Sequence, residues 1–260
     1  MTYIDGFIAP VPRANRDAYL KHVRAAAPLF EEAGVRRFVE AWADDVPEGK
    51  VTDFRKAVNA KGDEDVVFAW FEYASKEERD AATGKFRNDP RMKEIGASMP
   101  FDGKRMILGG FDPIVEEGGE RGRYIDGFVV PVPRDKLDAY TQLAQKAAGI
   151  FREYGALRDI EAVGDDVPRG EVTDFYRAVK AEDGETVVFS FIEWPDKATR
   201  DEAWKKVMAD ERMKPGGEMP FAGQRMFWGG FEPILDTARQ PALASSPSPI
   251  QPERKKPWPK

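Results

Sequence analysis

Three acidic residues in the first half of the chain lie within apolar stretches, which makes them the best candidates for acid or base chemistry. Asp5 alternates with Tyr3 and Phe7, and Glu40 and Glu72 also stand two positions from aromatic residues. A carboxylate buried on a strand face must be paired, hydrogen-bonded or protonated, because an isolated buried charge costs several kcal/mol. The full candidate set, with the counterparts in the second half, is Asp5, Glu40, Glu72, Asp126, Glu161 and Glu193.

Two roles are open for these carboxyl groups. Burial raises the pKa of a carboxyl group and a nearby arginine lowers it, so the set could supply a general acid or base. The same residues could instead form ion pairs that fix the register of the strands, and this is the interpretation we favour. Arg105 and Arg225, which we expect on the last strand of each half, are their natural partners.

Residues 91–101, which recur as 212–221, contain Met, Pro and Phe side chains that would be costly to expose. This segment is therefore expected to cover an apolar opening. It could be a lid above a pocket between helix and sheet, with an arginine binding an anionic ligand, or a strap that closes the rim of a barrel. We favour the strap. The candidate ligand-binding residues are Trp70, Arg91, Arg105, Arg212 and Arg225.

The remaining polar motifs have simpler explanations. His22 is the single histidine. The sequence offers no obvious axial ligand for a haem and no matched base for a Ser-His-Asp relay, so we assign His22 no role. The spacing of Asp44, Asp45 and Asp53 does not match a calcium-binding loop, and turn or helix-capping roles are expected instead. We expect neither a metal ion nor a cofactor.

The chain is an internal duplication. Residues 3–13, Tyr-Ile-Asp-Gly-Phe-Ile-Ala-Pro-Val-Pro-Arg, recur at 124–134 with two substitutions, and further matches continue at the same offset. After Lys214 the second copy lacks one residue, which shortens the offset by one. About half of the aligned positions are identical, far more than shared periodicity produces. We divide the chain into repeat 1 (1–117), a linker (118–123), repeat 2 (124–236) and a tail (237–260).

Each repeat has the pattern β-α-β-short element-β-α-β, which predicts a ferredoxin-like α+β domain. Residues 51–60 suit a short helix or a strand almost equally, and residues 105–111 form the expected last strand. Residues 66–73 are apolar on both faces of their predicted strand, whereas two helices can cover only one face of a four-stranded sheet. The other face must therefore meet a second sheet, and the other repeat supplies one.

The motifs Tyr-Ile-Asp-Gly-Phe, Asp-Asp-Val-Pro, Val-Thr-Asp-Phe, Arg-Met-Lys, Met-Pro-Phe and Gly-Gly-Phe resemble those of the uncharacterised bacterial YbaA family. The resemblance covers nearly all of residues 1–117 and 122–236. It implies a dimeric α/β-barrel, in which two ferredoxin-like units pair their sheets. A tandem copy would be a single-chain version of that dimer, and we expect it to be monomeric. The family has no established activity, so the resemblance implies a fold rather than a function.

Composition limits the chemistry, the partners and the cellular location that can be expected of the protein. The 260 residues include no cysteine and carry a formal charge of −6, which excludes thiolate chemistry and disfavours a nucleic-acid surface. We expect a cytoplasmic protein, since residues 1–13 lack the apolar run of a signal peptide and no stretch suits a membrane span. Residues 116–123 are expected to be a flexible linker, and the proline-rich, basic residues 237–260 are expected to be disordered.

Three hypotheses for function follow. The first is a small-molecule-binding protein with a pocket between helices and sheet in each half, contacted by Glu40, Glu72 and Arg105. The second is a cofactor-independent monooxygenase-like or isomerase-like enzyme, with Glu72 or Asp5 as the base. The third is an interaction module without a pocket, whose basic tail recruits a partner. A cavity of ligand size, about 300 Å³ or more, is required by the first two.

Overall fold

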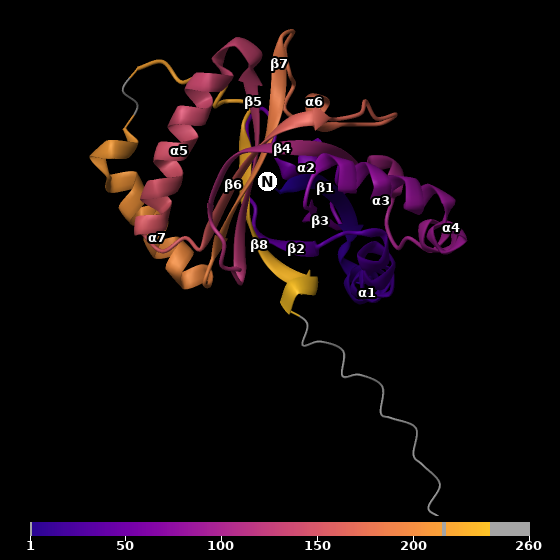
Figure 1. The fold of residues 1–260 in the computed structure, drawn as a ribbon. Helices are drawn as coiled ribbons and strands as arrows, with labels where there is room; N and C mark the ends of the chain where they lie inside the picture. Colours follow the sequence, from indigo (N-terminus) through magenta and orange to yellow (C-terminus); the bar gives the residue numbers. More distant parts are fainter. Residues whose placement is uncertain (1, 215–216, 240–260) are drawn as a thin grey trace, which may run out of the picture.

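The computed structural model describes residues 2–214 and 217–239, and its elements follow the two repeats (Figure 1). Repeat 1 contains β1 (Tyr3–Pro12), α1 (Arg16–Ala33), β2 (Arg37–Asp45), α2 (Phe54–Ala57), β3 (Glu64–Tyr73), α3 (Lys76–Asn88), α4 (Pro90–Ala97) and β4 (Ile107–Gly118). Repeat 2 contains β5 (Tyr124–Pro133), α5 (Leu137–Glu153), β6 (Arg158–Asp166), α6 (Phe175–Ala178), β7 (Glu185–Trp194), α7 (Lys197–Ala209) and β8 (Phe227–Asp236). Short 3-10 turns are η1 (Arg13–Asn15), η2 (Gly103–Arg105), η3 (Arg134–Lys136), η4 (Glu211–Met213) and η5 (Thr237–Arg239).

The strands form one closed antiparallel barrel in the order β1-β3-β2-β8-β5-β7-β6-β4. Repeat 1 contributes four neighbouring strands and repeat 2 the other four, so two seams join the halves. One seam pairs β2 with β8 and the other pairs β4 with β6. The prediction of an α+β protein whose two halves share one antiparallel barrel is confirmed. The long helices of the two repeats lie on opposite sides of this barrel (Figure 1).

Local sequence signals account for the helix ends. Ser75 caps α3, because its side chain accepts a hydrogen bond from the backbone N–H of Glu78. Asp53 caps α2 in the same way through Lys56, so residues 51–60 contain a short helix rather than a strand. Helix α1 ends before Gly34, whose φ of 124° is one that glycine adopts without strain.

Aromatic side chains fill the inside of the barrel. Phe68 of β3 stacks on Phe189 of β7 with ring centroids 4.6 Å apart, and Trp70 stacks on Phe191 at 4.1 Å. Helix α2 adds Phe54, which packs against Phe68 edge to face, and α6 contributes its equivalent to the same core. The inner face of each sheet is thus covered by the other repeat, as the two-faced apolar pattern of residues 66–73 predicted.

An ion-pair cluster lies beyond the Trp70–Phe191 pair and crosses between the repeats. Arg37 donates two hydrogen bonds to Glu193, at 2.7 and 2.8 Å, and one to Glu72 at 3.1 Å. Arg158 of repeat 2 donates to Glu72 at 2.7 Å. We call Arg37, Glu72, Arg158 and Glu193 the inter-repeat ion cluster. Its side chains are almost entirely buried, so they hold one half of the barrel to the other.

Three expectations about connections need correction. Strand β4 is longer than expected and runs to Gly118, because residues 116–118 pair with β6 instead of belonging to a flexible linker. Arg105 lies in η2, before β4, rather than on the strand. At the end of repeat 2, Thr237 accepts a hydrogen bond from the backbone of Phe38 and begins η5, so the first residues assigned to the tail are ordered against β2. Residues 240–260 lie outside the described residues.

None of the helices in residues 2–214 and 217–239 combines the length and the apolar character needed to cross a lipid bilayer.

Candidate functional site

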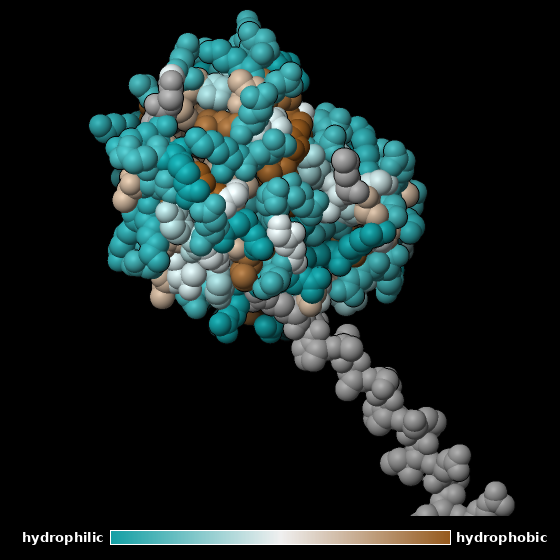
Figure 2. All heavy atoms as spheres, turned by 60° about the vertical axis from the view of Figure 1, so that its left-hand side comes forward, coloured by the Kyte–Doolittle hydropathy of each residue, from teal (hydrophilic) through white to brown (hydrophobic). Residues whose placement is uncertain are grey.

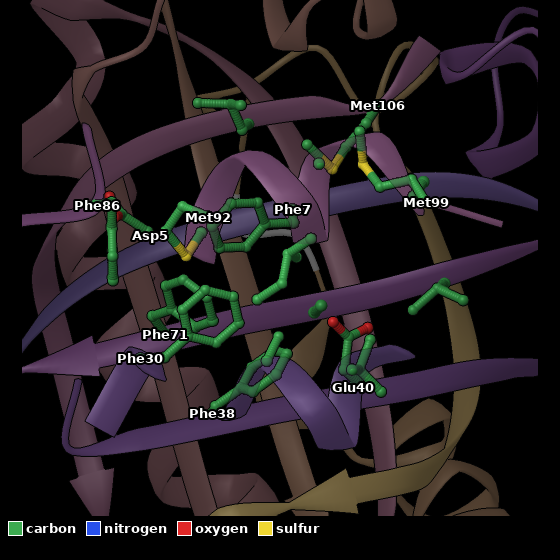
Figure 3. Close-up of a pocket in the computed structure, with 18 of the residues that line it drawn as sticks. Asp5, Phe7, Phe30, Phe38, Glu40, Phe71, Phe86, Met92, Met99 and Met106 are labelled. Atoms are coloured by element: carbon green, nitrogen blue, oxygen red, sulfur yellow. The ribbon is translucent and has the colours of Figure 1, made fainter. Parts of the chain in front are cut away.

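Each repeat holds a cavity between the outer face of its half of the barrel and its helices. The first has a volume of about 510 Å³ and is lined by residues of β1, β2 and β3 on one side and of α1, α3 and α4 on the other; Figure 3 shows side chains that line it. The second lies at the equivalent place in repeat 2 and has a volume of about 450 Å³. Both exceed the size required by the two ligand hypotheses, and most of the surface of both is apolar.

Glu40 lies at the floor of the first cavity, where Figure 3 shows its carboxyl group among apolar side chains. It is 6% exposed and accepts a hydrogen bond of 2.7 Å from the hydroxyl of Tyr19 on α1. Burial raises the pKa of Glu40 to about 8, and the Tyr19 hydrogen bond opposes this only in part. The group is therefore protonated at neutral pH and can give or take a proton near that pH.

Asp5 of β1 lies at the other end of the same cavity. It accepts hydrogen bonds from Nε of Arg79 at 2.9 Å and from the hydroxyl of Tyr73 at 3.2 Å. Burial raises the pKa of Asp5 to about 6, against the lowering effect of Arg79. Arg79 also donates to Asp166 of repeat 2 at 2.6 Å, so residues of both repeats complete this end of the first cavity.

The segment 91–101 forms the roof of the first cavity. Met92, Ile95, Met99 and Phe101 line it, and Figure 3 shows Met92 and Met99 among the side chains around the cavity. The segment therefore covers a pocket between helices and sheet, which is the position that the lid alternative predicted, rather than the barrel rim, where the favoured strap would lie. Methionine side chains are flexible and polarisable, which suits a roof that adapts to the shape of a ligand.

The second cavity repeats one polar contact and loses another. Glu161 accepts a hydrogen bond of 2.7 Å from Tyr140, and burial raises its pKa to about 7. Asp126, the counterpart of Asp5, is completely buried and does not line this cavity. Asp159 occupies the position of Phe38 and is 2% exposed, with one carboxyl oxygen lacking a hydrogen-bond partner, and burial raises its pKa strongly.

The structure separates the remaining sequence candidates from the cavities. Glu72 and Glu193 belong to the inter-repeat ion cluster, and Trp70 lies inside the barrel. Although burial opposes it, Arg158 holds the pKa of Glu72 below its usual value. Glu72 and Glu193 therefore form ion pairs, as the favoured interpretation expected, whereas Trp70, which was predicted to bind a ligand, lines neither cavity.

The arginines predicted from the sequence also lie elsewhere. Arg105 forms two hydrogen bonds with Glu64, at 2.7 and 2.6 Å, and Arg225 does the same with Glu185. Glu64 and Glu185 are buried, but they are not among the six candidate carboxyl groups, so the expected pairing of these arginines with the candidates is wrong. Arg91 is bound at the surface to Asp89, as its counterpart is to Asp210, although Arg212 also reaches the edge of the second cavity.

The sequence analysis missed Arg79 and its counterpart Arg200, which are the true partners of Asp5 and Asp126. Both are buried arginines on helices that are otherwise rich in charge, so composition did not distinguish them from surface residues. The acidic pair Asp44 and Asp45 was assigned to turns. It instead crosses to the other repeat, where Asp45 accepts from Arg200 at 2.8 Å.

His22 lines the first cavity from α1, and burial lowers its pKa. It is therefore a neutral hydrogen-bonding group at pH 7. Among residues 2–214 and 217–239, no group of three or more His, Cys, Asp or Glu side chains is arranged to hold a metal ion.

Fold and cavities together define the class of protein. It is an α+β protein of the dimeric α/β-barrel type, with ligand-sized cavities between the barrel and its helices. The chain belongs to the family described as protein of unknown function (DUF1428), whose model matches residues 2–103 and again residues 123–223. The resemblance to YbaA drawn from the sequence motifs is thus confirmed.

Known proteins similar to this chain include YbaA of Escherichia coli (strain K12), described as uncharacterized. It is 62% identical over 117 residues, which are 45% of this chain and 100% of YbaA. YbaA of Shigella flexneri gives the same values. The chain thus spans the full length of these relatives and is more than twice as long.

Solved structures share the fold. One is named "Putative monooxygenase" from Fusobacterium nucleatum, with a TM-score of 0.56, 11% identity, and coverage of 90% of this chain and 93% of that one. Another is named "putative monooxygenase" from Lactobacillus acidophilus NCFM, with a TM-score of 0.53, 10% identity, and coverage of 91% and 96%. At these identities the likeness concerns the fold alone.

Proposed function

We propose that the protein binds a small, largely apolar molecule in its first cavity, with Glu40 and Tyr19 as polar contacts. The observation that supports this most directly is a cavity of about 510 Å³ with a buried carboxyl group at its floor. Protein interiors are otherwise packed so closely that few voids exceed the size of a water molecule. The barrel interior follows this rule, whereas the space beneath α1, α3 and α4 does not.

The charge state of the floor indicates the kind of ligand. Glu40 is protonated at pH 7 and has Tyr19 as its hydrogen-bonding neighbour. A neutral carboxyl group in an apolar cavity favours an uncharged ligand with a hydroxyl, carbonyl or amide group, because a charged ligand would lose its hydration without gaining a counter-ion. The aromatic floor residues Phe7, Phe38 and Phe71 favour a planar or ring-shaped ligand (Figure 3).

The test is calorimetric titration with 4-hydroxybiphenyl, a neutral, two-ring phenol. We expect binding to the wild-type protein and its loss from the first cavity in Ala69→Phe, since Ala69 lines the floor there. Ser190→Phe is the matched variant for the second cavity. Absence of binding to the wild type, together with no small molecule retained in native mass spectra of protein purified gently from cells, would contradict the proposal.

A second candidate is an enzyme that moves a proton without a cofactor, and the raised pKa of Glu40 favours it. In an isomerase, the ionised fraction of Glu40, which grows as the pH approaches 8, would take a proton from the carbon next to a carbonyl group and return it to another carbon. A monooxygenase-like reaction would begin with the same proton transfer. The resulting carbanion would reduce molecular oxygen, so that a CH2 group of the substrate becomes a carbonyl group, with one oxygen atom retained there and the other released as water. The solved structures named as monooxygenases support this candidate only through their shared fold.

Several properties of the whole molecule belong to this proposal. The order β4-β1-β3-β2 within repeat 1, with α1 and α3 on one side, supports the ferredoxin-like description of each repeat. The closed barrel supports a monomer in solution, because the eight strands of residues 2–214 and 217–239 leave no open sheet edge for a second copy. The lack of cysteine agrees with a cytoplasmic location.

A further inference from the structure

The two cavities differ at one end. Asp5 and Arg79 line the first cavity together with Asp166 and Pro168 from repeat 2. In the described part of the chain, the second cavity lacks the equivalent end, because the described residues that line it all come from repeat 2, and neither Asp126 nor its partner arginine is among them. The arginine–aspartate pair itself exists in both repeats, so the cavities differ because neighbouring residues leave the pair open in repeat 1 and cover it in repeat 2.

Trp204 is the residue that closes the second cavity at this end. Its indole Nε1 donates a hydrogen bond of 2.7 Å to Asp126, and Trp194 donates a second one at 2.9 Å. The ring of Trp204 also packs against Phe151 and Trp228. Asp126 is consequently 0% exposed, compared with 8% for Asp5.

Thr83 takes the place of Trp204 in repeat 1 and leaves this end open. It lies one helical turn after Arg79, and its hydroxyl donates to the Arg79 carbonyl at 3.0 Å. The side chain is therefore short and turned towards its own helix. Tyr73, which replaces Trp194, leaves Asp5 with one hydroxyl donor at 3.2 Å in addition to Arg79.

The open end suits a neutral polar group. A ligand hydroxyl or amide can donate to the Asp5 carboxyl group and accept from the Arg79 guanidinium. A ligand anion would meet the carboxylates of Asp5 and Asp166, and a ligand cation would meet Arg79, so charged groups gain less at this position.

The distance between the two polar ends sets the length of the ligand. Strands β1 and β2 flank β3 on opposite sides. Asp5 of β1 pairs with Phe71 of β3, whereas Glu40 of β2 pairs with Ala69, two residues away along β3. From standard sheet spacings the Cα atoms of Asp5 and Glu40 are roughly 12 Å apart. Figure 3 shows the two carboxyl groups well separated, with aromatic rings in the space between them.

We propose that the first cavity takes an elongated, uncharged ligand with a hydrogen-bonding group at each end, one at Asp5 and Arg79 and the other at Glu40. Thr83 determines this length. The second cavity, shortened by Trp204, takes a ligand with one such group, which binds at Glu161. This inference rests on the proposed binding function and assigns a ligand class to each cavity.

The test compares 4,4′-dihydroxybiphenyl, which has a hydroxyl at each end, with 4-hydroxybiphenyl in calorimetric titrations of the full chain. In the wild type we expect one site that binds the diol at least tenfold more tightly than the mono-ol, and a second site that does not discriminate. Thr83→Trp should abolish the tenfold preference. Thr83→Val should keep it, because valine has nearly the same size as threonine and leaves the cavity equally long. Trp204→Thr should give the second site the same preference.

The outcomes separate this inference from the proposed function. Failure of both compounds to bind the wild type contradicts the proposed function. Binding of both compounds with a diol preference that persists in Thr83→Trp, or with no preference in the wild type, overturns the inference and leaves the binding function intact. If Thr83→Trp does not fold, as thermal melting would reveal, the gain or absence of a preference in Trp204→Thr decides the matter.

Discussion

The hydroxyl of Tyr19 donates a hydrogen bond of 2.7 Å to Oε2 of Glu40, and Tyr140 makes the same contact with Glu161 at the same distance. The pair is kept in both repeats although residues beside it differ, such as Phe38 against Asp159. Neutral donors, Tyr19 for Glu40 and Tyr140 with Ser190 for Glu161, do not compensate the loss of hydration of a buried carboxylate. Each glutamic acid therefore keeps its proton to a higher pH than it would in water.

Stability should therefore fall as the pH rises from 5 to 8.5. In this window the unfolded chain releases the proton of Glu40, whose pKa is then near 4.5, while the folded protein holds it until the pH reaches about 8. The folded state binds more protons, and the free energy of unfolding decreases with pH. Asp5 and Glu161, with pKa values raised to about 6 and 7, add to the same slope.

Glu40→Gln isolates the contribution of one group to this slope. Glutamine accepts the Tyr19 hydrogen bond but does not titrate, so the variant should match the wild type at pH 5 and be more stable at pH 8.5. Chemical denaturation at both pH values measures the difference, which should be on the order of 4 kcal/mol. An identical pH slope in wild type and variant would show that Glu40 does not carry the raised pKa.

Glu72→Gln should lower stability without changing ligand binding. Glu72 joins Arg37 and Arg158 in the inter-repeat ion cluster, and its removal leaves two buried arginines with one fewer counter-charge. We expect a loss of about 2–4 kcal/mol in the free energy of unfolding. Glu32→Gln, at an exposed surface pair, is the control and should change stability by less than about 0.5 kcal/mol. Loss of 4-hydroxybiphenyl binding in a folded Glu72→Gln would instead place this residue in the ligand site.

Gly6→Ala should destabilise the barrel from inside. A Cβ atom at Gly6 would lie 2.8 Å from the ring of Phe189, which is completely buried and stacked on Phe68. We expect a loss of roughly 1–3 kcal/mol, typical of overpacked cores. Gly62→Ala is the matched control, because nothing lies within 4 Å of a Cβ there. Equal melting temperatures for the two variants would contradict the tight packing of the barrel interior.

The full chain should be a monomer of 29.2 kDa in light scattering coupled to size-exclusion chromatography. The reason is that every strand of the barrel has two hydrogen-bonded neighbours within the same chain. A stable dimer at micromolar concentration would show that the seams between the repeats exchange between chains.

The sequence predicted the fold well because the duplication is visible from comparing the two copies, and the strand patterns are visible from residues close together in the sequence. It could not say which face of a strand points into the barrel. Glu40 and Glu72 follow the same alternation with aromatic residues, yet Glu40 faces the cavity and Glu72 faces the interior. When both faces of a strand are apolar, the period of two residues identifies the faces but not their surroundings.

Contacts between the repeats were the other limit. Arg79 meets Asp166, and Tyr3 donates to Asp165 at 2.9 Å, across more than 80 positions of sequence. No local spacing relates these residues, so the acidic pairs were assigned to turns. The position of residues 91–101 could not be predicted for the same reason. Once the two repeats close the barrel, α2, α6 and the inter-repeat ion cluster occupy its rim, and residues 91–101 lie elsewhere.

The seam between β2 and β8 also dictates the order in which the molecule can be completed during synthesis. Strand β2 leaves the ribosome early, but its partner β8 is the last strand of the barrel. Val39, for example, cannot pair until Asp236 has been synthesised. Until then the nascent chain presents an unpaired strand edge, the feature that promotes joining of one chain to another. Each chain being translated therefore remains open to pairing with a neighbour on the same messenger until nearly all of both repeats has been made.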